Sequence, residues 1–361
     1  MSRLLSRFVF IASITLLTML YNGSAQAKLV DNLYAAEVEV ASQSNSHRQQ
    51  AIREAFERVI LKVTGQPESI EHEAVERALR SVSNYLIQYG YSDNQGQRTL
   101  TATFDGTKVR SLLAEHQLPY WGSRRPELLM WIVTENEDGR RTILDSSGQS
   151  VFQQQLSFFA RQLSLPIRMP LMDLTDSFTI SPTDVWARFM QPIKETSKRY
   201  GSDGLFVGKI MRNAESEEPW VLDWSVEVGD RRLYGKVSAT SKDWLAEPLM
   251  QQLMAKLSSI YSVTASDESV SQTMAIKVEG LNKLQHVLAL ESFLKSIVSV
   301  QDVTLKHYSQ SLSEFDIVIN GSLDHVIQSI NLDGRLKVRD MGPFVSMSEN
   351  QVQTYEWRGG N

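Results

Sequence analysis

The sequence predicts a multi-domain protein of the mixed α/β (α+β) class, and three observations support this. The chain has 361 residues, of which 42% are hydrophobic and 22% are charged, an ordinary balance for a globular protein. Helical and strand periodicities are mixed along the chain, and no apolar run after the N-terminal one is long enough to span a bilayer. At about 150 residues per domain, the length favours two or three domains.

The first 27 residues have the three-part pattern of a cleaved secretory signal peptide. Arg3 and Arg7 give a positive start, 8–20 is an apolar run, and Ala25 and Ala27 occupy the positions that a signal peptidase reads. The alternative is an uncleaved membrane anchor, but a spanning helix needs about 20 apolar residues and this run is shorter. We therefore expect cleavage after Ala27, a periplasmic location and no integral membrane span in the mature chain.

Charge and cysteine content exclude several classes of function. Loss of the leader lowers the formal net charge from −5 to −7, because the leader carries two arginines and no acids. An acidic chain argues against general binding to nucleic acids or anionic membranes, which depends on clustered lysine and arginine. The chain has no cysteine, which excludes disulfides, zinc–thiolate sites, iron–sulfur clusters, cysteine nucleophiles and a cysteine-linked lipid anchor.

The first predicted domain, 28–126, has the order strand, helices, strand, strand, helix. Alternating apolar residues predict a strand over 33–41. Ser46 is expected to cap a helix with an apolar stripe from Ala51 to Val63, which Gly65 ends. The remaining elements are a helix over 70–84, strands over 85–91 and 98–104, and a helix over 108–116.

The second predicted domain, 127–263, is built around a strand over 128–133, where continuous apolarity indicates burial on both faces. A second buried strand is predicted over 205–210. The other predicted elements are helices over 151–163, 184–200 and 242–261, and a hairpin of 220–228 and 231–239.

The third predicted domain, 272–340, follows a polar linker over 265–271. Its order of strand, helix, strand, strand, helix, strand predicts a ferredoxin-like sandwich, with helices on one face of an antiparallel sheet. The predicted ranges are 274–278, 282–297, 300–307, 315–319, 323–330 and 335–338. We expect a flexible tail over 341–361.

The segment 118–126, between the first two domains, carries the candidate binding residues Tyr120, Trp121, Arg124 and Arg125. Tryptophan, tyrosine and arginine dominate interface hot spots, which favours a recognition surface. The alternative is a stiff hinge, in which Trp121 packs into a core and the arginines contact acidic neighbours. We favour the hinge, because a short linker between packed domains needs rigid residues.

Known catalytic and metal-binding motifs are not found in the sequence. It has no His-Glu-x-x-His, phosphate loop, G-x-G-x-x-G or G-x-S-x-G. Asp173, Asp176 and Asp184 match no calcium loop and are better explained as caps and turn residues. For Trp220 and Trp224, on one face of a strand, core packing is a better explanation than a sugar-stacking platform. No catalytic residue, metal ligand or cofactor is therefore assigned, although paired carboxylates stay open.

Four motifs occur in one order: Ala51-x3-Ala55-Phe56-x2-Val59-x3-Val63-Thr64-Gly65, Tyr85-x3-Gln88-Tyr89, Phe104-Asp105 and Leu118-Pro119-x-Trp121-Gly122-x2-Arg125-Pro126. Together they resemble an exported Gram-negative family, domain of unknown function 2066 (DUF2066), over most of 28–262. This resemblance implies export and architecture but no reaction. The segment 200–210 is more weakly similar to envelope accessory domains of the type at the front of TolB and in the curli-secretion protein. It implies structural roles for Gly201 and Gly208, although Ser202 stands where alanine is usual.

The sequence leads us to expect a non-enzymatic periplasmic scaffold or accessory binding protein of the cell envelope. Its expected partners are envelope proteins or peptidoglycan, without nucleic acid or cofactor. Two alternatives stay open. One is an envelope hydrolase with a carboxylate-based site, and the other is a small-ligand binding protein with Trp121 and Arg124 or Arg125 as contacts. The oligomeric state is not predicted.

Overall fold

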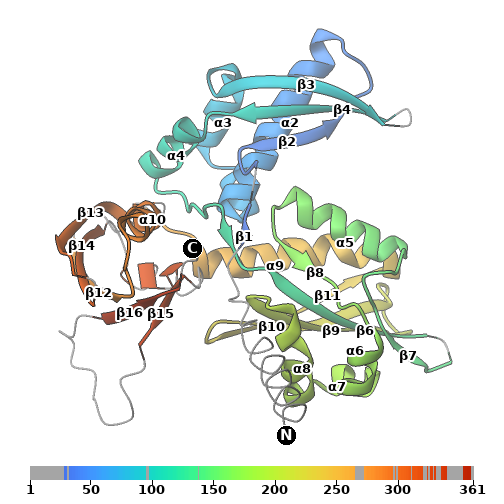
Figure 1. The fold of residues 1–361 in the computed structure, drawn as a ribbon. Coiled ribbons are helices and arrows are strands. Elements are labelled where there is room, and N and C mark those ends of the chain that lie inside the picture. The colour runs from blue at the N-terminus through green and yellow to red at the C-terminus, as the bar shows by residue number, and fades with distance from the viewer. Residues whose placement is uncertain are drawn as a thin grey trace, which may run out of the picture.

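The computed structural model describes residues 28–358, except 31, 95–96, 137, 265–271, 296, 298–299, 310, 320–322, 324–325, 328, 331–334 and 340–352. The predicted signal peptide, with Ala25 and Ala27, and the predicted linker over 265–271 lie outside the described residues. The fold is mixed α+β, as predicted, with three bodies that each have their own apolar core (Figure 1). We name them the N-terminal, central and C-terminal units. None of the described helices has the length and apolar character needed to span a bilayer.

The N-terminal unit is an antiparallel sheet in the order β2-β4-β3 with helices packed on one face. Helix α2 is capped by Ser44 instead of the predicted Ser46, which already lies within the first turn. Gly65 ends this helix as predicted, in the left-handed conformation (φ 68°) that glycine adopts at little cost. The elements are β1 (Lys28–Leu29), β2 (Ala35–Glu39), α2 (Asn45–Thr64), η2 (Pro67–Ser69), α3 (Glu73–Arg80), η3 (Val82–Asn84), β3 (Leu86–Asn94), β4 (Gln97–Phe104) and α4 (Gly106–Glu115).

The two faces of this sheet differ in chemistry. Leu100, Ala102 and Phe104 of β4 are buried in the same core as the apolar stripe of α2. Because side chains alternate along a strand, Thr101 and Thr103 point to the opposite face, where they are half-buried. The second face is therefore polar, and it is available to contact another part of the molecule.

Strand β2 lies at one edge of the sheet, and cationic side chains from α2 cover its outward backbone. Hydrogen bonds from Val40 N to Arg98 O and from Phe104 N to Tyr34 O show that the even-numbered residues of this segment pair with β4. The outward carbonyl of Ala35 accepts from Lys62 Nζ (2.7 Å), and that of Glu37 accepts from Arg58 Nη1 (2.6 Å). A further strand therefore cannot pair freely along β2.

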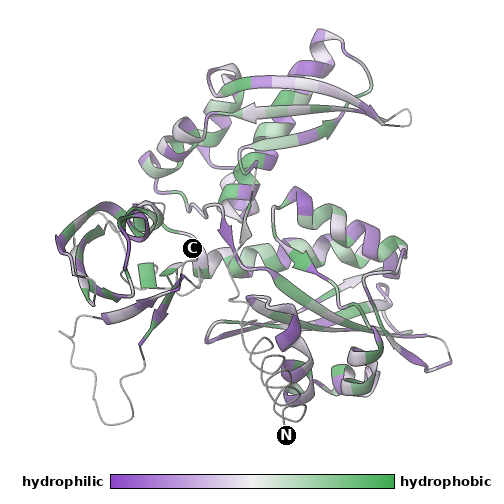
Figure 2. Ribbon diagram, viewed as in Figure 1, coloured by the Kyte–Doolittle hydropathy of each residue, from purple (hydrophilic) through white to green (hydrophobic). Residues whose placement is uncertain are grey.

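The central unit is a mixed sheet in the order β11-β10-β9-β6-β7, with β8 also paired to β6. Strand β6 is parallel to β9 and β8, and its residues from Leu128 to Val133 are all buried, as predicted. Figure 2 shows the hydropathy of the residues along the ribbon. One face packs on α5 and α9, the other on α7 and α8. Trp224 is buried in the first of these cores, which confirms its packing role. The elements are β5 (Arg124–Arg125), β6 (Leu128–Glu135), β7 (Arg141–Ile143), α5 (Val151–Gln162), β8 (Ile167–Arg168), α6 (Leu174–Thr179), α7 (Pro182–Ala187), α8 (Met190–Ser197), η4 (Lys198–Tyr200), β9 (Gly204–Arg212), β10 (Trp220–Val228), β11 (Arg231–Ala239), η5 (Lys242–Leu245) and α9 (Ala246–Tyr261).

The single helix predicted over 184–200 is wrong. The segment forms α7, α8 and η4, with a break at Arg188, whose φ is 56°. Pro192 explains the break, because proline lacks an N–H and fits only the first turn of a helix, where α8 places it.

The C-terminal unit is a five-stranded sheet in the order β13-β14-β12-β16-β15. Its elements are β12 (Gln272–Glu279), α10 (Leu284–Lys295), β13 (Val300–His307), β14 (Ser313–Ile319), β15 (Leu336–Val338) and β16 (Gln353–Trp357). The described residues between 323 and 330 are helical, in agreement with the predicted second helix.

Two expectations for this unit need correction. Gln353–Trp357 lies within the range predicted as a flexible tail, yet it forms β16, with Tyr355 fully buried. This strand is parallel to β12 and antiparallel to β15, so it separates two strands that a simple ferredoxin-like sandwich would place side by side. The sheet is consequently mixed instead of purely antiparallel.

Candidate functional site

The segment 118–126 lies at the point where the three units meet, and its aromatic residues connect their cores. Tyr120 belongs to the core of the N-terminal unit, whereas Trp121 belongs to that of the central unit. The Trp121 ring, 2% exposed, stacks on Tyr261 of α9 with 5.7 Å between centroids. Its backbone N–H donates to the carbonyl of Val63 near the end of α2 (2.6 Å). These contacts correspond to the hinge interpretation of Trp121.

Arg125 is fully buried and joins the ends of two helices. Its guanidinium donates to five backbone carbonyl oxygens, among them Lys62 in α2 and Leu163 after α5 (2.6 Å for Leu163). It also lies 4.5 Å from the ring centroid of Trp121. We expected acidic neighbours for this arginine. Its partners are instead backbone carbonyl groups at the ends of helices, where no intrahelical N–H donates to them. Burial lowers the pKa of Arg125 to about 9.

Arg124 points to the C-terminal unit. Its guanidinium carbon lies 4.3 Å from the ring centroid of Phe293 in α10, and Arg335 contacts the same ring at 4.5 Å. Burial, and secondarily the charge of Arg335, lower the pKa of Arg124 to about 10. Arg124 therefore connects the segment 118–126 to the C-terminal unit, as Arg125 connects it to α2 and α5.

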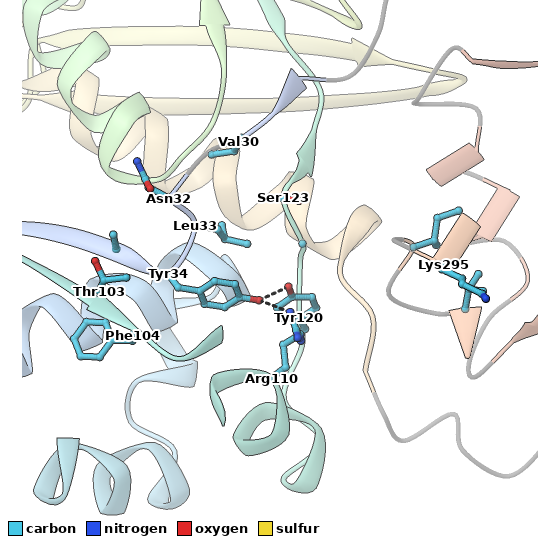
Figure 3. A pocket seen from close by; sticks show the side chains of 14 residues that line it. Val30, Asn32, Leu33, Tyr34, Thr103, Phe104, Arg110, Tyr120, Ser123 and Lys295 are labelled. Atoms are coloured by element: carbon cyan, nitrogen blue, oxygen red, sulfur yellow. Dashed lines mark hydrogen bonds between the residues drawn. The ribbon is translucent and has the colours of Figure 1, made fainter. Parts of the chain in front are cut away.

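A cavity of about 800 Å³, here called the junction pocket, opens beside this segment. The hydroxyl groups of Tyr34 and Tyr120 are 2.6 Å apart, and Arg110 Nη1 donates to the Tyr34 hydroxyl at 3.3 Å (Figure 3). Lys295 of α10 lines the pocket from the C-terminal unit. Burial raises the pKa of Tyr120, so its hydroxyl stays protonated and can donate a hydrogen bond. The full lining is Val30, Asn32, Leu33, Tyr34, Ala35, Thr103, Phe104, Arg110, Tyr120, Gly122, Ser123, Lys295, Ile297 and Val300.

A second cavity of about 740 Å³, here called the sheet-face pocket, lies between the polar face of the N-terminal sheet and α5. Lys62, Arg161 and Glu37 are its charged lining residues among those described. Lys62 is only 5% exposed. Burial, and secondarily the charge of Arg125, lower the pKa of Lys62 to about 8.

The charge of these cavities contrasts with that of the whole chain. Of the described residues that line them, Arg110, Lys295, Lys62 and Arg161 are cationic, and Glu37 is acidic. The chain as a whole has a formal net charge of −5. A cationic, partly desolvated cavity on an acidic protein favours the binding of anionic groups, because Coulomb interactions strengthen where water is excluded.

Asp203 and Glu127, directly before β9 and β6, form an acid pair that could be considered for the carboxylate-based site. Asp203 Oδ2 accepts the backbone N–H of Glu127 at 2.8 Å, and Glu127 pairs with Arg168 at 2.8 Å. Burial is the main cause that raises the pKa of Asp203 to about 6. Neither acid lines the junction pocket or the sheet-face pocket, so the pair has no described cavity for a substrate.

The three aspartates considered for calcium have structural contacts. Asp173 caps α6, and Asp184 forms a capping box with Ser181 at the start of α7, as predicted for caps. Asp176 is fully buried and accepts from the Tyr200 hydroxyl and from Arg199 Nη1 (3.1 Å). In the part of the chain that the structure describes, no group of three or more histidine, aspartate or glutamate side chains could hold a metal ion.

Sequence reasoning found Tyr120 but missed the groups that surround its hydroxyl. Tyr34 is 86 residues away along the chain, and Arg110 comes from the helix predicted over 108–116, for which no binding residue was proposed. Lys62 is a charged residue of α2, yet it is buried and its ammonium donates to the carbonyl of Ala35. No local pattern marks these positions, because the contacts arise only when separate units pack together.

Comparison with known proteins gives one family match. Residues 27–122 match a family described as Domain of unknown function (DUF8605). The resemblance to DUF2066 is therefore wrong, since the matching family is a different one and covers only the first part of the chain. The motifs behind that resemblance are an apolar helix stripe, a helix-ending glycine and the packed segment 118–126, which many folds require. No curated protein matches the chain, and the similarity to TolB and curli-secretion domains gains no support.

Proposed function

We propose that this protein is a non-enzymatic accessory protein of the cell envelope, exported to the periplasm, that binds an anionic ligand in the junction pocket. The observation that carries the proposal is the cluster of Tyr34, Tyr120 and Arg110. Two hydroxyl groups and one guanidinium converge there from three segments on an open cavity of about 800 Å³. Such donors suit a carboxylate or phosphate group, because charge-assisted hydrogen bonds are the stronger ones.

The buried contacts of Trp121 and Arg125 support a binding role, since they hold the walls of the pocket in place. A preorganised site loses less conformational entropy on binding than a mobile one. The proposal also changes the small-ligand alternative, because Tyr34, Arg110 and Tyr120 replace Trp121, Arg124 and Arg125 as the contacts.

The test is isothermal titration calorimetry with inorganic phosphate and citrate. Arg110→Gln should weaken binding at least tenfold, because one charge-assisted hydrogen bond contributes about 1.5–3 kcal/mol. Tyr34→Phe should weaken it severalfold, since it removes the hydroxyl between Tyr120 and Arg110. Arg77→Gln is the matched control, because Arg77 is an exposed arginine of α3 with 50% side-chain exposure. Equal affinities for wild type and Arg110→Gln would refute the proposed site.

Export and location have a separate test. Cell fractionation followed by N-terminal sequencing should find a periplasmic form that begins at Lys28. A form that keeps Met1 and sediments with membranes would contradict the proposed location.

A hydrolase remains the second candidate, and the raised pKa of Asp203 is the observation that favours it. Hydrolysis of an envelope substrate that is abolished by Asp203→Asn, with the fold retained, would support it over the binding role. The position of Asp203 outside both cavities makes the binding role the better supported of the two.

A further inference from the structure

The junction pocket and the sheet-face pocket are neighbours that share part of their walls. Val30, Asn32, Ala35 and Thr103 line both cavities. These residues belong to the chain between β1 and β2, to β2 itself and to the end of β4. A ligand seated at the Tyr34 hydroxyl therefore has a path along this wall to the second cavity.

The sheet-face pocket has three kinds of surface within reach of one ligand. Lys62 and Arg161 supply two positive charges against the one negative charge of Glu37, and Thr101 and Gln162 supply polar groups. Phe158 supplies an apolar surface and is 42% exposed, so its ring is open to contact. A ligand that matches this wall carries acidic, polar and apolar groups on one chain.

We infer that the two pockets form one groove that binds an extended acidic segment of a partner protein, with at least one carboxylate in each pocket. The inference rests on the proposed function, because the junction pocket provides the first anion site. A peptide suits the lining better than an acidic glycan, because its side chains supply both the carboxylates and the apolar groups for Phe158. Acidic motifs are commonly recognised by clustered cations.

The outward edge of β2 determines whether such a segment can bind by backbone pairing. Lys62 and Arg58 already occupy the outward carbonyl groups of Ala35 and Glu37. The peptide therefore does not add a strand to the sheet, and side chains of the groove must hold it. A round cavity of this volume is roughly 11 Å across, so two in a row accommodate about seven extended residues at ~3.3 Å each.

The experiment measures fluorescence anisotropy of two labelled peptides, an eight-residue chain of alternating glutamate and leucine and its four-residue half. An eight-residue peptide of glutamine and leucine is the uncharged control, and an eight-sugar oligogalacturonate is the acidic glycan. Arg161→Gln tests the second pocket, Arg110→Gln tests the first, and Arg77→Gln is again the matched control.

The acidic octapeptide should bind at least tenfold more tightly than the tetrapeptide. Arg161→Gln should remove this advantage and leave tetrapeptide affinity within twofold of wild type, whereas Arg110→Gln should weaken both peptides. The inference is overturned if Arg161→Gln leaves octapeptide binding unchanged, or if the uncharged peptide or the glycan binds as tightly as the acidic octapeptide. Unchanged tetrapeptide binding in Arg110→Gln would instead refute the proposed function of the junction pocket.

Discussion

Replacement of Arg125 by methionine tests whether the segment 118–126 fixes the N-terminal unit to the central unit. Methionine preserves much of the side-chain length but removes the charge and every donor. The carbonyl oxygens of Lys62 and Leu163 then lose the guanidinium that satisfies them at the ends of α2 and α5. Trp121 also loses the cation that lies 4.5 Å from its ring centroid.

The expected loss of stability follows from these contacts. A hydrogen bond to a charged group contributes roughly 1.5–3 kcal/mol, and Arg125 makes two close ones, to Lys62 and Leu163. Burial of the guanidinium itself costs several kcal/mol, and methionine avoids that cost. Loss of the guanidinium leaves the carbonyl oxygens of Lys62 and Leu163 without their donor, at about 1–3 kcal/mol for each unsatisfied buried group. We therefore expect Arg125→Met to lose about 3 kcal/mol.

The assay is urea denaturation followed by tryptophan fluorescence, to which Trp121 contributes as one of the seven tryptophans of the chain. Arg125→Lys should fall between wild type and Arg125→Met, since an ammonium keeps the charge but offers three donors without the guanidinium geometry. The matched control, Arg77→Met on the exposed surface of α3, should stay within about 0.5 kcal/mol of wild type. If Arg125→Met unfolds within 1 kcal/mol of wild type, this account of the junction is wrong.

Three further predictions concern packing and pH. Gly65→Ala should lower the free energy of unfolding by at least about 1 kcal/mol, because φ is 68° and the added Cβ would lie 2.4 Å from Cβ of Ser258. Adding Ser258→Gly to this variant should relieve the clash and recover that part of the stability, measured by thermal denaturation. The pKa of Asp203, about 6, lies above its ordinary value of 3.8, so ionisation of this carboxyl should lower the stability of wild type relative to Asp203→Asn as pH rises from about 4 to 6. Asp203→Asn should abolish that loss and be roughly 1–2 kcal/mol more stable at pH 7, and a flat difference across pH in urea titrations would count against it. Lys62 loses its charge above its pKa of about 8, so affinity for the acidic octapeptide should fall severalfold between pH 7 and 9. The groups around Lys62 are Arg125, Glu37 and Arg58, and a pH-independent affinity in anisotropy titrations would contradict its role.

Local patterns predicted most of the elements. The apolar stripe of α2, the buried strand β6 and the hairpin of β10 and β11 each follow from neighbouring residues. The prediction failed where a distant or single residue decides the structure. Pro192 breaks a helix that the apolar periodicity alone would continue. Strand β16 pairs with β12 from more than 70 residues away, and a five-residue strand carries little local signal.

Less of the candidate site than of the fold could be predicted from the sequence. The residue types in 118–126 pointed to a segment that borders the junction pocket, and Tyr120 lines that pocket. Three of the four candidate residues instead contact other units, through the Trp121 ring and the two arginine side chains. Whether an aromatic or arginine residue binds a partner or holds its own protein together depends on which surfaces cover it, and that is a property of the assembled chain.

The cationic cover on β2 has a consequence for how copies of this protein meet one another. In the order β2-β4-β3, the two outer strands are the places where a neighbouring molecule could extend the sheet. Arg58 and Lys62 obstruct the first, while the second, β3, carries the exposed side chains of Ile87 and Tyr89. Domain swapping or fibril-like stacking through this sheet is therefore confined to the β3 side, and a charged substitution at Ile87 is the rational way to suppress it.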